Sequence, residues 1–372
     1  MRIGFLTNNT RIDNGWGRSA RELVGALRRK DIGVLVLVEE GGGLAGELKK
    51  LARAQGHPVF LFASVVRTLT TLYRCDLIHA FDGYPYAIIG AVAAACLRKK
   101  LIVTLHGTYA LDPFYNRRRY IRYLYRWALK RADRIVTVSR YTRRTVEAEA
   151  GFALLGAVVI PNGTSAFWLA APQSVVVPPV PKPYILGVGM VKPQKGYAVS
   201  MHAYAQIKKR FPALSYVIVG DQAGRHFQEM RDLARQLGVA DSVRFFEKIS
   251  DEALLSFYDH AACFVLTPVR NRMYIEGFGL VYREAGARGL AVVGSRDSGA
   301  EDAIIDGKTG ILCPQNGIGA VADAVMTILG DPDLAGRMGR EGKKVAAQDT
   351  WARVAAAYYA LYQETLTRYD HA

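Results

Sequence analysis

Cysteine is scarce in this chain. Only four of the 372 residues are cysteine, they are widely scattered, and none belongs to a Cys-x-x-Cys pair. This pattern offers neither a disulfide framework nor a cysteine metal site, and it favours reduced structural thiols in a cytosolic protein. No cluster of His, Asp or Glu at metal-ligand spacing is evident in the sequence either.

Long hydrophobic runs are missing as well. The longest, around Ala87–Leu97, is far below the roughly 20 apolar residues that span a bilayer. The first residues, MRIGFLTNN, are typical of a strand and show no signal-peptide cleavage pattern. We therefore expect a cytoplasmic protein. Hydrophobic residues make up 50% of the chain, which excludes a mostly disordered protein.

Acidic residues are depleted in the first half only. Residues 1–180 hold 26 Lys and Arg against 12 Asp and Glu, a net charge of +14. Residues 181–372 hold 23 against 21, a net charge of +2. The first half is therefore expected to meet something acidic, which could be nucleic acid, an anionic membrane or a phosphorylated substrate.

What the sequence does contain is a regular alternation of short apolar runs with helix-length segments such as Ser19–Lys30 and Val199–Phe211. This alternation predicts parallel sheets covered on both faces by helices. The predicted strands are Ile3–Thr7, Gly33–Val38, Leu77–Ala80, Leu101–Leu105, Ile135–Val138, Val158–Ile160, Tyr184–Val188, Tyr216–Val219, Val243–Phe245, Cys263–Thr267, Ala291–Gly294 and Gly310–Leu312.

A proline-rich stretch, AAPQSVVVPPVPKPY, divides the chain. Its prolines disfavour helices and central strands, which is typical of a stiff linker. The sequence thus predicts an α/β protein with two Rossmann-like, doubly wound domains facing a cleft, formed by residues 1–171 and 172–350. The last helix, within residues 351–372, has no strand after it and is expected to dock back on the first domain.

The most informative segment is EGFGLVYRE, Glu276–Glu284. Two glutamates eight residues apart flank a Gly-Phe-Gly turn, and a helix is expected to begin near Leu280. Backbone N–H groups in such a turn attract phosphate or sugar oxygens. Glu284 could accept two hydrogen bonds from a ribose diol. An ordinary strand–turn–helix with solvated carboxylates would have the same pattern, so the segment alone is not decisive.

A second signal lies upstream, in GVGMVKPQKGY. It places Lys195 and Gly196 after the first strand of the second half, at the carboxyl edge of a sheet where ligands bind. A lysine there can neutralise a departing diphosphate, although most lysines are only solvated.

Taken in order, the strings GVGMVKPQKG, VIVGD, VRFFEKIS, EGFGLVYREAGARGLAVVGS, SGAED and DGKTGIL resemble glycosyltransferase family 4, which has the GT-B fold. The first half adds the weaker matches NGWGRSARELVGAL, LHGTY, VTVSRYT and VIPNGTSAFW. The resemblance implies retaining, metal-independent transfer of a sugar from a nucleotide diphosphate by front-face substitution. It implies no cofactor beyond this nucleotide-sugar co-substrate, with UDP-sugars slightly favoured over GDP-mannose.

The resemblance also implies roles for individual residues. A carboxylate against the donor sugar, a cleft histidine and a lysine facing the diphosphate form the catalytic set: Glu276, His106 and Lys195. A glycine loop near the phosphates, the turn amides and the ribose carboxylate join that lysine in the donor-binding set: Gly15, Gly17, Gly277, Phe278, Gly279, Leu280 and Glu284.

One position departs from the family. An arginine often follows the glycine at position 189, and this chain has Met190 there. Lys192, Arg270 or Arg272 could supply the missing cation. Our hypothesis is that Arg272 assists Lys195 in stabilising the leaving diphosphate, where a positioned charge is worth roughly 3–4 kcal/mol.

Gly15 to Ala20 also mimic the dinucleotide-binding fingerprint, with Glu39 and Glu40 about twenty residues further on. An NAD(P)-dependent oxidoreductase is therefore a competing interpretation. Against it stand the long segment between Thr7 and Gly15, where a tight turn is required, and the unexplained motifs of the second half.

Residues 116–134, NRRRYIRYLYRWALKRADR, hold eight basic residues and one acidic residue. On a helix, five cations share one face: Arg118, Arg119, Arg122, Arg126 and Lys130. The opposite face is apolar and is expected to be core: Tyr120, Ile121, Leu124, Trp127 and Ala128.

The basic face of this segment, with tyrosines beside it, favours docking on the anionic inner leaflet of the cell membrane. A lipid-linked or glycan acceptor would be reached there, in the synthesis of cell-surface polysaccharide, lipopolysaccharide or glycolipid. A nucleic-acid-binding protein is a third interpretation, but no recognised reader motif supports it, so no nucleic-acid partner is expected.

Overall fold

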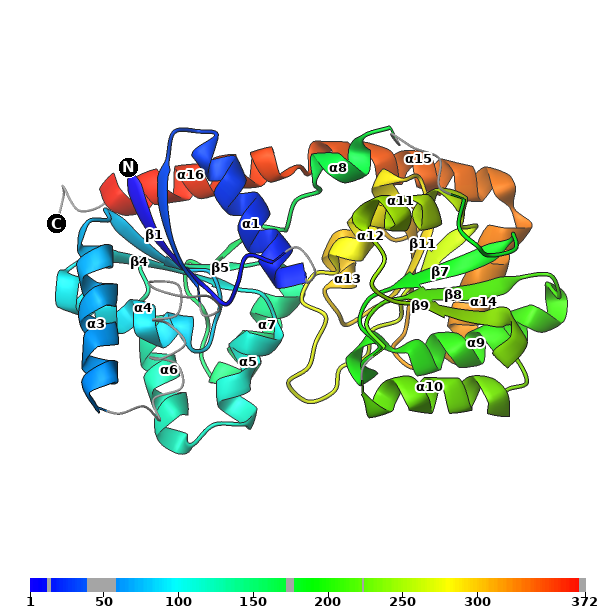
Figure 1. The fold of residues 1–372 in the computed structure, drawn as a ribbon, viewed down its shortest axis with the longest axis horizontal. Coiled ribbons are helices and arrows are strands. Elements are labelled where there is room, and N and C mark those ends of the chain that lie inside the picture. The colour runs from blue at the N-terminus through cyan, green and yellow to red at the C-terminus, as the bar shows by residue number, and fades with distance from the viewer. Residues whose placement is uncertain (12–14, 39–57, 172–176, 223, 368–372) are drawn as a thin grey trace. The chain divides into compact units, whose positions relative to one another are not determined.

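The computed structural model describes residues 1–372 apart from 12–14, 39–57, 172–176, 223 and 368–372. The chain forms two compact units, which are labelled by element in Figure 1. The first unit comprises Met1–Gly163 together with Trp351–Ala372, and the second comprises Thr164–Thr350.

The first unit is built on a six-stranded parallel sheet with the strand order β2-β1-β3-β4-β5-β6. Its strands are β1 (Arg2–Thr7), β2 (Gly33–Val38), β3 (Leu77–Ala80), β4 (Lys100–Leu105), β5 (Arg134–Thr137) and β6 (Val158–Val159). The inner strands β1, β3 and β4 are buried almost throughout, because helices cover both faces of the sheet.

The described helices of the first unit are α1 (Gly15–Arg28), α3 (Pro58–Tyr73), α4 (Tyr86–Leu97), α5 (Thr108–Tyr115), α6 (Arg119–Arg131), α7 (Arg140–Ala150) and α16 (Trp351–Thr367). Helix α4 packs between α3 and α6, whereas α1 packs against α16 (Figure 1). The helices lie on opposite faces of the sheet because the crossovers are right-handed. One crossover leads from β1 outward to β2, and the next leads back across the sheet to β3.

Helix α16 is fixed to the first unit by a buried polar network. The Tyr362 hydroxyl lies 2.7 Å from His79 Nδ1, and the Thr104 hydroxyl lies 2.8 Å from His79 Nε2 and 3.0 Å from the Tyr358 hydroxyl. Burial lowers the pKa of His79 to about 3, so the imidazole is neutral and each ring nitrogen has a partner. The last helix of the chain therefore completes the core of the first unit.

The second unit repeats the architecture, with the strand order β12-β11-β10-β7-β8-β9, again all parallel. Its strands are β7 (Tyr184–Val188), β8 (Ser215–Val219), β9 (Val243–Phe246), β10 (Cys263–Val265), β11 (Val292–Ser295) and β12 (Gly310–Cys313). The described α-helices are α8 (Ala166–Leu169), α9 (Tyr197–Arg210), α10 (Arg225–Gln236), α11 (Asp251–His260), α12 (Leu280–Ala287), α13 (Ala300–Ala303), α14 (Ile318–Gly330) and α15 (Pro332–Gln348).

The predicted fold class, α/β with two doubly wound parallel sheets, is confirmed. Each predicted strand is present, with ends that differ by at most two residues. The unit boundary falls at residue 163 rather than 171, because α8 packs on the second unit. Trp168 lies edge-on to the Tyr258 ring, 5.7 Å away, and its carbonyl accepts a hydrogen bond from Arg288.

The predicted orientation of α6 is wrong. Tyr125, Ala128 and Leu129 are the buried residues of this helix, whereas Tyr120 and Trp127 are exposed. The buried face is therefore shifted by one residue, or about 100°, from the predicted core face. The reason is Tyr125, whose ring packs edge-on against the ring of Phe114. Because the helix is rigid, this contact also sets which of its other side chains face the core.

Candidate active site

The candidate site of the second unit lies where the strand order reverses. β7 is followed by β8 on one side of the sheet, whereas β10 pairs with it on the other side. Loops that leave the carboxyl ends of two such strands form the usual ligand-binding edge of a doubly wound sheet. Lys195 ends the short 3₁₀ turn η2 (Pro193–Lys195) after β7, and Glu276 lies in the loop after β10.

Lys195 and Glu276 meet at this edge although they are 81 residues apart in the chain. The lysine Nζ lies 2.5 Å from Glu276 Oε2, and the side chains are 19% and 13% exposed, respectively. Such a partly buried pair is screened less by water than a surface pair, so its charges act strongly on a ligand nearby. The structure thus joins two of the three predicted catalytic residues.

Two buried tyrosines lie beside this ion pair. The Tyr197 hydroxyl donates a hydrogen bond to the Gly189 carbonyl, and the Tyr282 hydroxyl donates one to the Leu266 carbonyl. Burial, reinforced by the neighbouring Glu276 carboxylate, raises the pKa of both phenols well above their usual range. They therefore stay neutral and hold the loops after β7 and β10.

The glycine turn Gly277–Gly279 sits directly before α12. Gly279 has a φ of +85°, and a Cβ there would lie 2.6 Å from the Tyr282 ring, so only glycine fits. A Cβ on Gly299 would collide with the Gly277 backbone, and the Gly299 N–H donates to the Glu276 carbonyl at 2.8 Å. The turn is therefore clamped at the N-terminus of α12, which favours anionic ligands.

Glu284 lies on α12 and is 7% exposed. Its Oε2 atom accepts a hydrogen bond of 3.0 Å from the hydroxyl of Tyr258, which comes from α11. The sequence did not identify Tyr258, because nothing in α11 marks a tyrosine 26 residues before Glu284 as its partner. The tyrosine fixes the direction of the carboxylate that is expected to bind ribose.

Arg272, the proposed substitute for the missing arginine, lies in the loop before Glu276. It has a φ of +53° in a turn closed by two backbone hydrogen bonds between Asn271 and Tyr274. Its side chain is exposed and forms no ion pair with any described residue. Met190, which stands where the family often has an arginine, is 40% exposed. No contact among the described residues shows which cation takes that place, so the role of Arg272 stays a prediction.

Three predicted site residues belong to the first unit. His106 directly follows β4 and is 8% exposed, and burial lowers its pKa to about 3. Phe81 packs edge-on against the imidazole at 4.4 Å, and Nε2 has no hydrogen-bond partner among the described residues. This neutral ring can exchange a hydrogen bond with a sugar hydroxyl, but it cannot act as a cation near neutral pH.

The two predicted site glycines of the first unit, Gly15 and Gly17, differ in the space that surrounds them. Gly15 begins α1 and has open space around it, whereas a Cβ on Gly17 would collide with Asn9 and the Arg11 backbone. Both lie in the first turn of a helix, where the dinucleotide fingerprint expects a loop. Glu39 and Glu40, the other part of that interpretation, lie outside the described residues.

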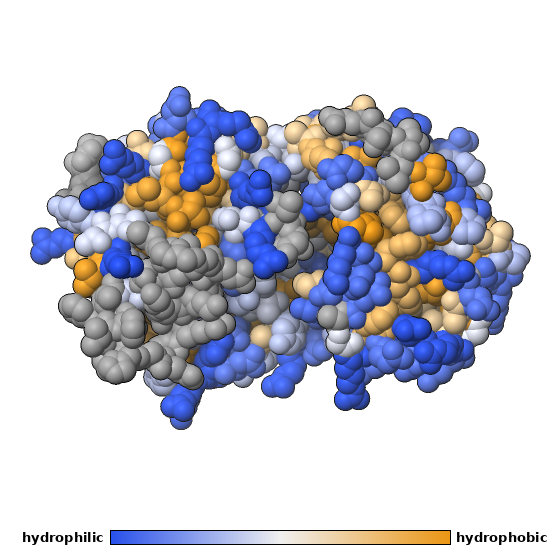
Figure 2. Space-filling view, in the orientation of Figure 1, coloured by the Kyte–Doolittle hydropathy of each residue, from blue (hydrophilic) through white to orange (hydrophobic). Residues whose placement is uncertain are grey.

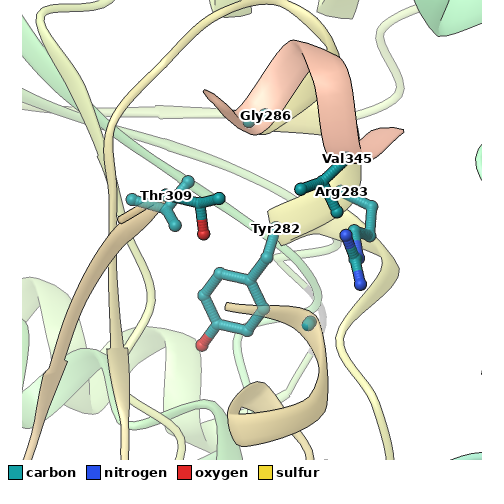
Figure 3. A pocket seen from close by; sticks show the side chains of 8 residues that line it. Tyr282, Arg283, Gly286, Thr309 and Val345 are labelled. Carbon is teal, nitrogen blue, oxygen red and sulfur yellow. The ribbon is translucent and has the colours of Figure 1, made fainter. Parts of the chain in front are cut away.

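The cavity drawn in Figure 3 has about 10 Å³, enough for about one water molecule. It is lined by Tyr282, Arg283 and Thr309, among others, and lies where α12 packs against α15. It is too small for a sugar. Close packing of Gly286 on Gly342 brings the two helices together there and supports α12 from behind.

Two family models match the chain. The model of Glycosyltransferase Family 4 matches residues 13–166, and the model of Glycosyl transferases group 1 matches residues 174–345. The chain belongs to glycosyltransferase family 4. The oxidoreductase interpretation is therefore wrong, since the segment Gly15–Ala20 that suggested it falls within the first match.

Known relatives of this family 4 glycosyltransferase agree in sequence and fold. It is 30% identical, over 80% of both chains, to a GDP-mannose-dependent alpha-(1-6)-phosphatidylinositol monomannoside mannosyltransferase of Mycolicibacterium smegmatis. The structure is similar to that of HepE of Anabaena in complex with UDP and glucose, with a TM-score of 0.80, 20% identity and coverage of 98% and 100%. A glycosyltransferase of Rickettsia africae gives a TM-score of 0.79 at 19% identity, with 98% of both chains covered.

Proposed function

We propose that this glycosyltransferase moves a hexosyl group from a nucleotide diphosphate to a hydroxyl group of a glycan or lipid-linked acceptor, with retention at the anomeric carbon. The observation that carries the proposal is the Lys195–Glu276 pair, which lies beside a clamped glycine turn at the ligand-binding edge of the second unit.

The chemistry follows from the charges that develop during transfer. When the bond between the anomeric carbon and the diphosphate oxygen breaks, the sugar becomes positive and the diphosphate gains negative charge. Lys195 and the amides of the glycine turn stabilise that diphosphate, and Arg272 adds a second cation. Glu284 holds the ribose, while the neutral imidazole of His106 binds a sugar hydroxyl.

The acceptor hydroxyl attacks the face from which the diphosphate departs and gives its proton to the leaving phosphate oxygen. No protein carboxylate forms a covalent intermediate in this scheme. Before donor arrives, Glu276 neutralises Lys195. The incoming diphosphate competes for that ammonium group and frees Glu276 to contact the donor sugar. We propose that neither a metal nor any cofactor beyond the nucleotide sugar takes part.

Two donors follow from the relatives. The M. smegmatis relative is named as dependent on GDP-mannose, whereas HepE was solved with UDP and glucose. The family resemblance slightly favours a UDP-sugar. A thermal-shift panel of UDP-, GDP- and ADP-sugars discriminates them, because only a nucleotide that binds the folded enzyme raises Tm.

The acceptor is proposed to lie at the inner face of an anionic membrane, in the synthesis of cell-surface polysaccharide, lipopolysaccharide or glycolipid. The net charge of +14 on residues 1–180 supports this location. No helix in the described part of the chain is long and apolar enough to cross a bilayer. We therefore propose peripheral attachment.

The reaction is tested by incubating the enzyme with the donor that raises Tm and with membrane lipid extract or oligosaccharides as acceptors. NMR of the product reports the anomeric configuration, and an excess of EDTA tests metal independence. An inverted anomer would contradict the retaining mechanism. Loss of activity in EDTA that Mg²⁺ restores would contradict metal independence.

A further inference from the structure

Helix α6 presents a stripe of large apolar side chains to solvent. Tyr120, Tyr123, Leu124 and Trp127 are 58%, 75%, 38% and 37% exposed, respectively. Their spacing of three, four and seven residues places them on one face of the helix. We call these four residues the aromatic stripe. Soluble proteins seldom expose so many neighbouring large apolar groups without a binding partner.

The opposite face fixes this orientation. Tyr125 is fully buried, with its ring 5.6 Å from the Phe114 ring. Arg122 donates a hydrogen bond of 2.7 Å to the Phe114 carbonyl, and the Arg126 guanidinium lies 6.0 Å from the Phe114 ring centre. Two of the five predicted surface cations are thus half-buried and hold the helix. The exposure of the aromatic stripe follows from how α6 packs.

Cations border the stripe. Arg118, Arg119 and Lys130 are exposed, and at 100° per residue Arg119 and Lys130 lie along one side of the stripe. Arg131, which the same geometry places within the stripe, is half-buried and pairs with Asp133 at 3.7 Å. Hydrophilic residues gather at the lower end of α6 in Figure 2. No acidic residue occurs in α6, so the face combines aromatic groups with the positive charge of Arg119 and Lys130.

The neighbouring helix α4 also exposes an apolar side chain. α4, which packs against α6, contains no charged residue between Tyr86 and Leu97, and its Val92 is 47% exposed. A helix that is apolar all round is normally covered on every side. Val92 therefore adds one exposed apolar side chain on a helix that packs against α6.

We propose that α6 lies in the headgroup region of an anionic bilayer, with the aromatic stripe inserted and the bordering cations on lipid phosphates. This rests on the proposed membrane location, and it replaces docking by charge alone with insertion of named side chains. Tyr and Trp concentrate at membrane interfaces, and a helix with such a face and a basic border is typical of interfacial binding. The exposed positive charge of Arg119 and Lys130 along one border of the stripe selects phosphate headgroups over an apolar protein partner.

Insertion is tested first with Trp127 as the probe. The chain has four tryptophans, and Trp168 and Trp351 are only 1% and 4% exposed. Vesicles of phosphatidylcholine and phosphatidylglycerol with brominated acyl chains should quench the fluorescence, and Trp127→Phe should remove most of that quenching. Equal quenching in Trp127→Phe, or none in the native protein, overturns the proposal.

Flotation with the same vesicles measures the contribution of the stripe. Replacing all four stripe residues by serine should weaken binding by about tenfold or more, because inserted apolar area drives interfacial binding. Leu155→Ser, at an apolar residue outside α6 that is 90% exposed, is the matched control and should bind like the native protein. Native binding by the fourfold variant, with loss only in a variant of Arg118, Arg119 and Lys130 to glutamine, would show docking by charge alone and overturn insertion.

Donor binding separates this proposal from the proposed function. Each variant is also tested for the thermal shift with UDP and GDP and for transfer to a water-soluble acceptor. Intact donor binding and transfer with lost flotation support the role of α6. A native protein that floats with no vesicle but binds random RNA through the stripe overturns the membrane partner, and its enzymatic activity still tests the proposed function.

Discussion

The two units carry the same six-stranded parallel sheet, yet residues 1–180 have a net charge of +14 and residues 181–372 only +2. In the second unit, cations with little exposure are paired with single carboxylates: Lys195 with Glu276, Arg283 with Asp349 and Arg288 with Asp259. In the first unit, α6 contains five cations and no acidic residue, and two of these cations, Arg119 and Lys130, are exposed. A ligand site needs a few placed charges, whereas a surface that meets many phosphates needs a spread of them.

The largest effect expected from this comparison is at Lys195. Lys195→Ala should lower kcat/KM by about 10²–10³-fold, because it removes the cation at the leaving diphosphate. Arg119→Gln on α6 should leave transfer to a soluble acceptor within about twofold, since an exposed charge that belongs to no proposed catalytic or donor-binding group is screened by water. Steady-state kinetics with the identified donor provide the measurement. A Lys195→Ala enzyme within about tenfold of native activity would contradict the assignment.

Acid should destabilise the first unit selectively. Burial lowers the pKa of His79 and His106 from 6.5 to about 3, so the unfolded chain binds more protons between these values. Stability is thus full above about pH 6.5 and falls as the pH drops toward 3, by about 2 kcal/mol per histidine at pH 5. Buried tyrosines of the second unit have a raised pKa and stay neutral over this range.

Urea unfolding at pH 7.5 and pH 5 measures this loss, and limited proteolysis with mass spectrometry assigns the cleaved bonds to one unit. His106→Asn should reduce the pH dependence by about half, because one of two titrating groups is removed. Equal acid sensitivity of both units would contradict the prediction.

A smaller effect is expected at Tyr258, which sharpens the description of the donor site. Tyr258→Phe removes one hydrogen bond to the Glu284 carboxylate and should weaken nucleotide binding by about tenfold. With a 2′,3′-dideoxynucleotide the native and variant enzymes should bind equally, because the ribose diol that Glu284 holds is absent. Calorimetric Kd values of the native and variant enzymes for both nucleotides test these two expectations.

Tyr184→Phe is the matched control, since its buried hydroxyl donates to the Phe257 carbonyl and faces no predicted site residue. An equal loss of affinity for the ribose and dideoxy forms in Tyr258→Phe would mean that Tyr258 acts on packing alone.

An effect of similar size is expected at Arg272. Arg272→Ala should lower kcat by about tenfold, less than Lys195→Ala, because an exposed cation is screened by water. Its Tm should not change, since the side chain is exposed and forms no ion pair with described residues. If Arg272→Ala leaves turnover unchanged while Lys195→Ala abolishes it, the arginine does not replace the cation that Met190 lacks.

Local chemistry made much of this molecule predictable. The strands follow from short β-branched and apolar runs. The glycine turn follows from the Gly-Phe-Gly pattern, since Gly279 has a positive φ that favours glycine. The start of α12 at Leu280 agrees with the predicted helix start. These features depend on residues close together in the chain.

The remainder depended on partners far away in the sequence. On α6, Tyr125 and Leu129 are no more apolar than Leu124 and Trp127, and the choice between the two faces was made by Phe114. Similarly, neither the contact of Lys195 with Glu276 nor that of Tyr258 with Glu284 has a local signature. When a helix has apolar side chains on two sides, its sequence alone does not indicate which side is buried.

The return of α16 to the first unit has a consequence for biosynthesis. Until the ribosome has made Tyr358 and Tyr362, His79 and Thr104 lack the hydroxyl partners that α16 brings to the core. In sequence, the second unit is inserted into the first. It can therefore fold while the core of the first unit is still incomplete. A chain truncated before residue 351 would hold a complete second unit and an incomplete first unit with exposed core, which is a typical substrate for chaperones.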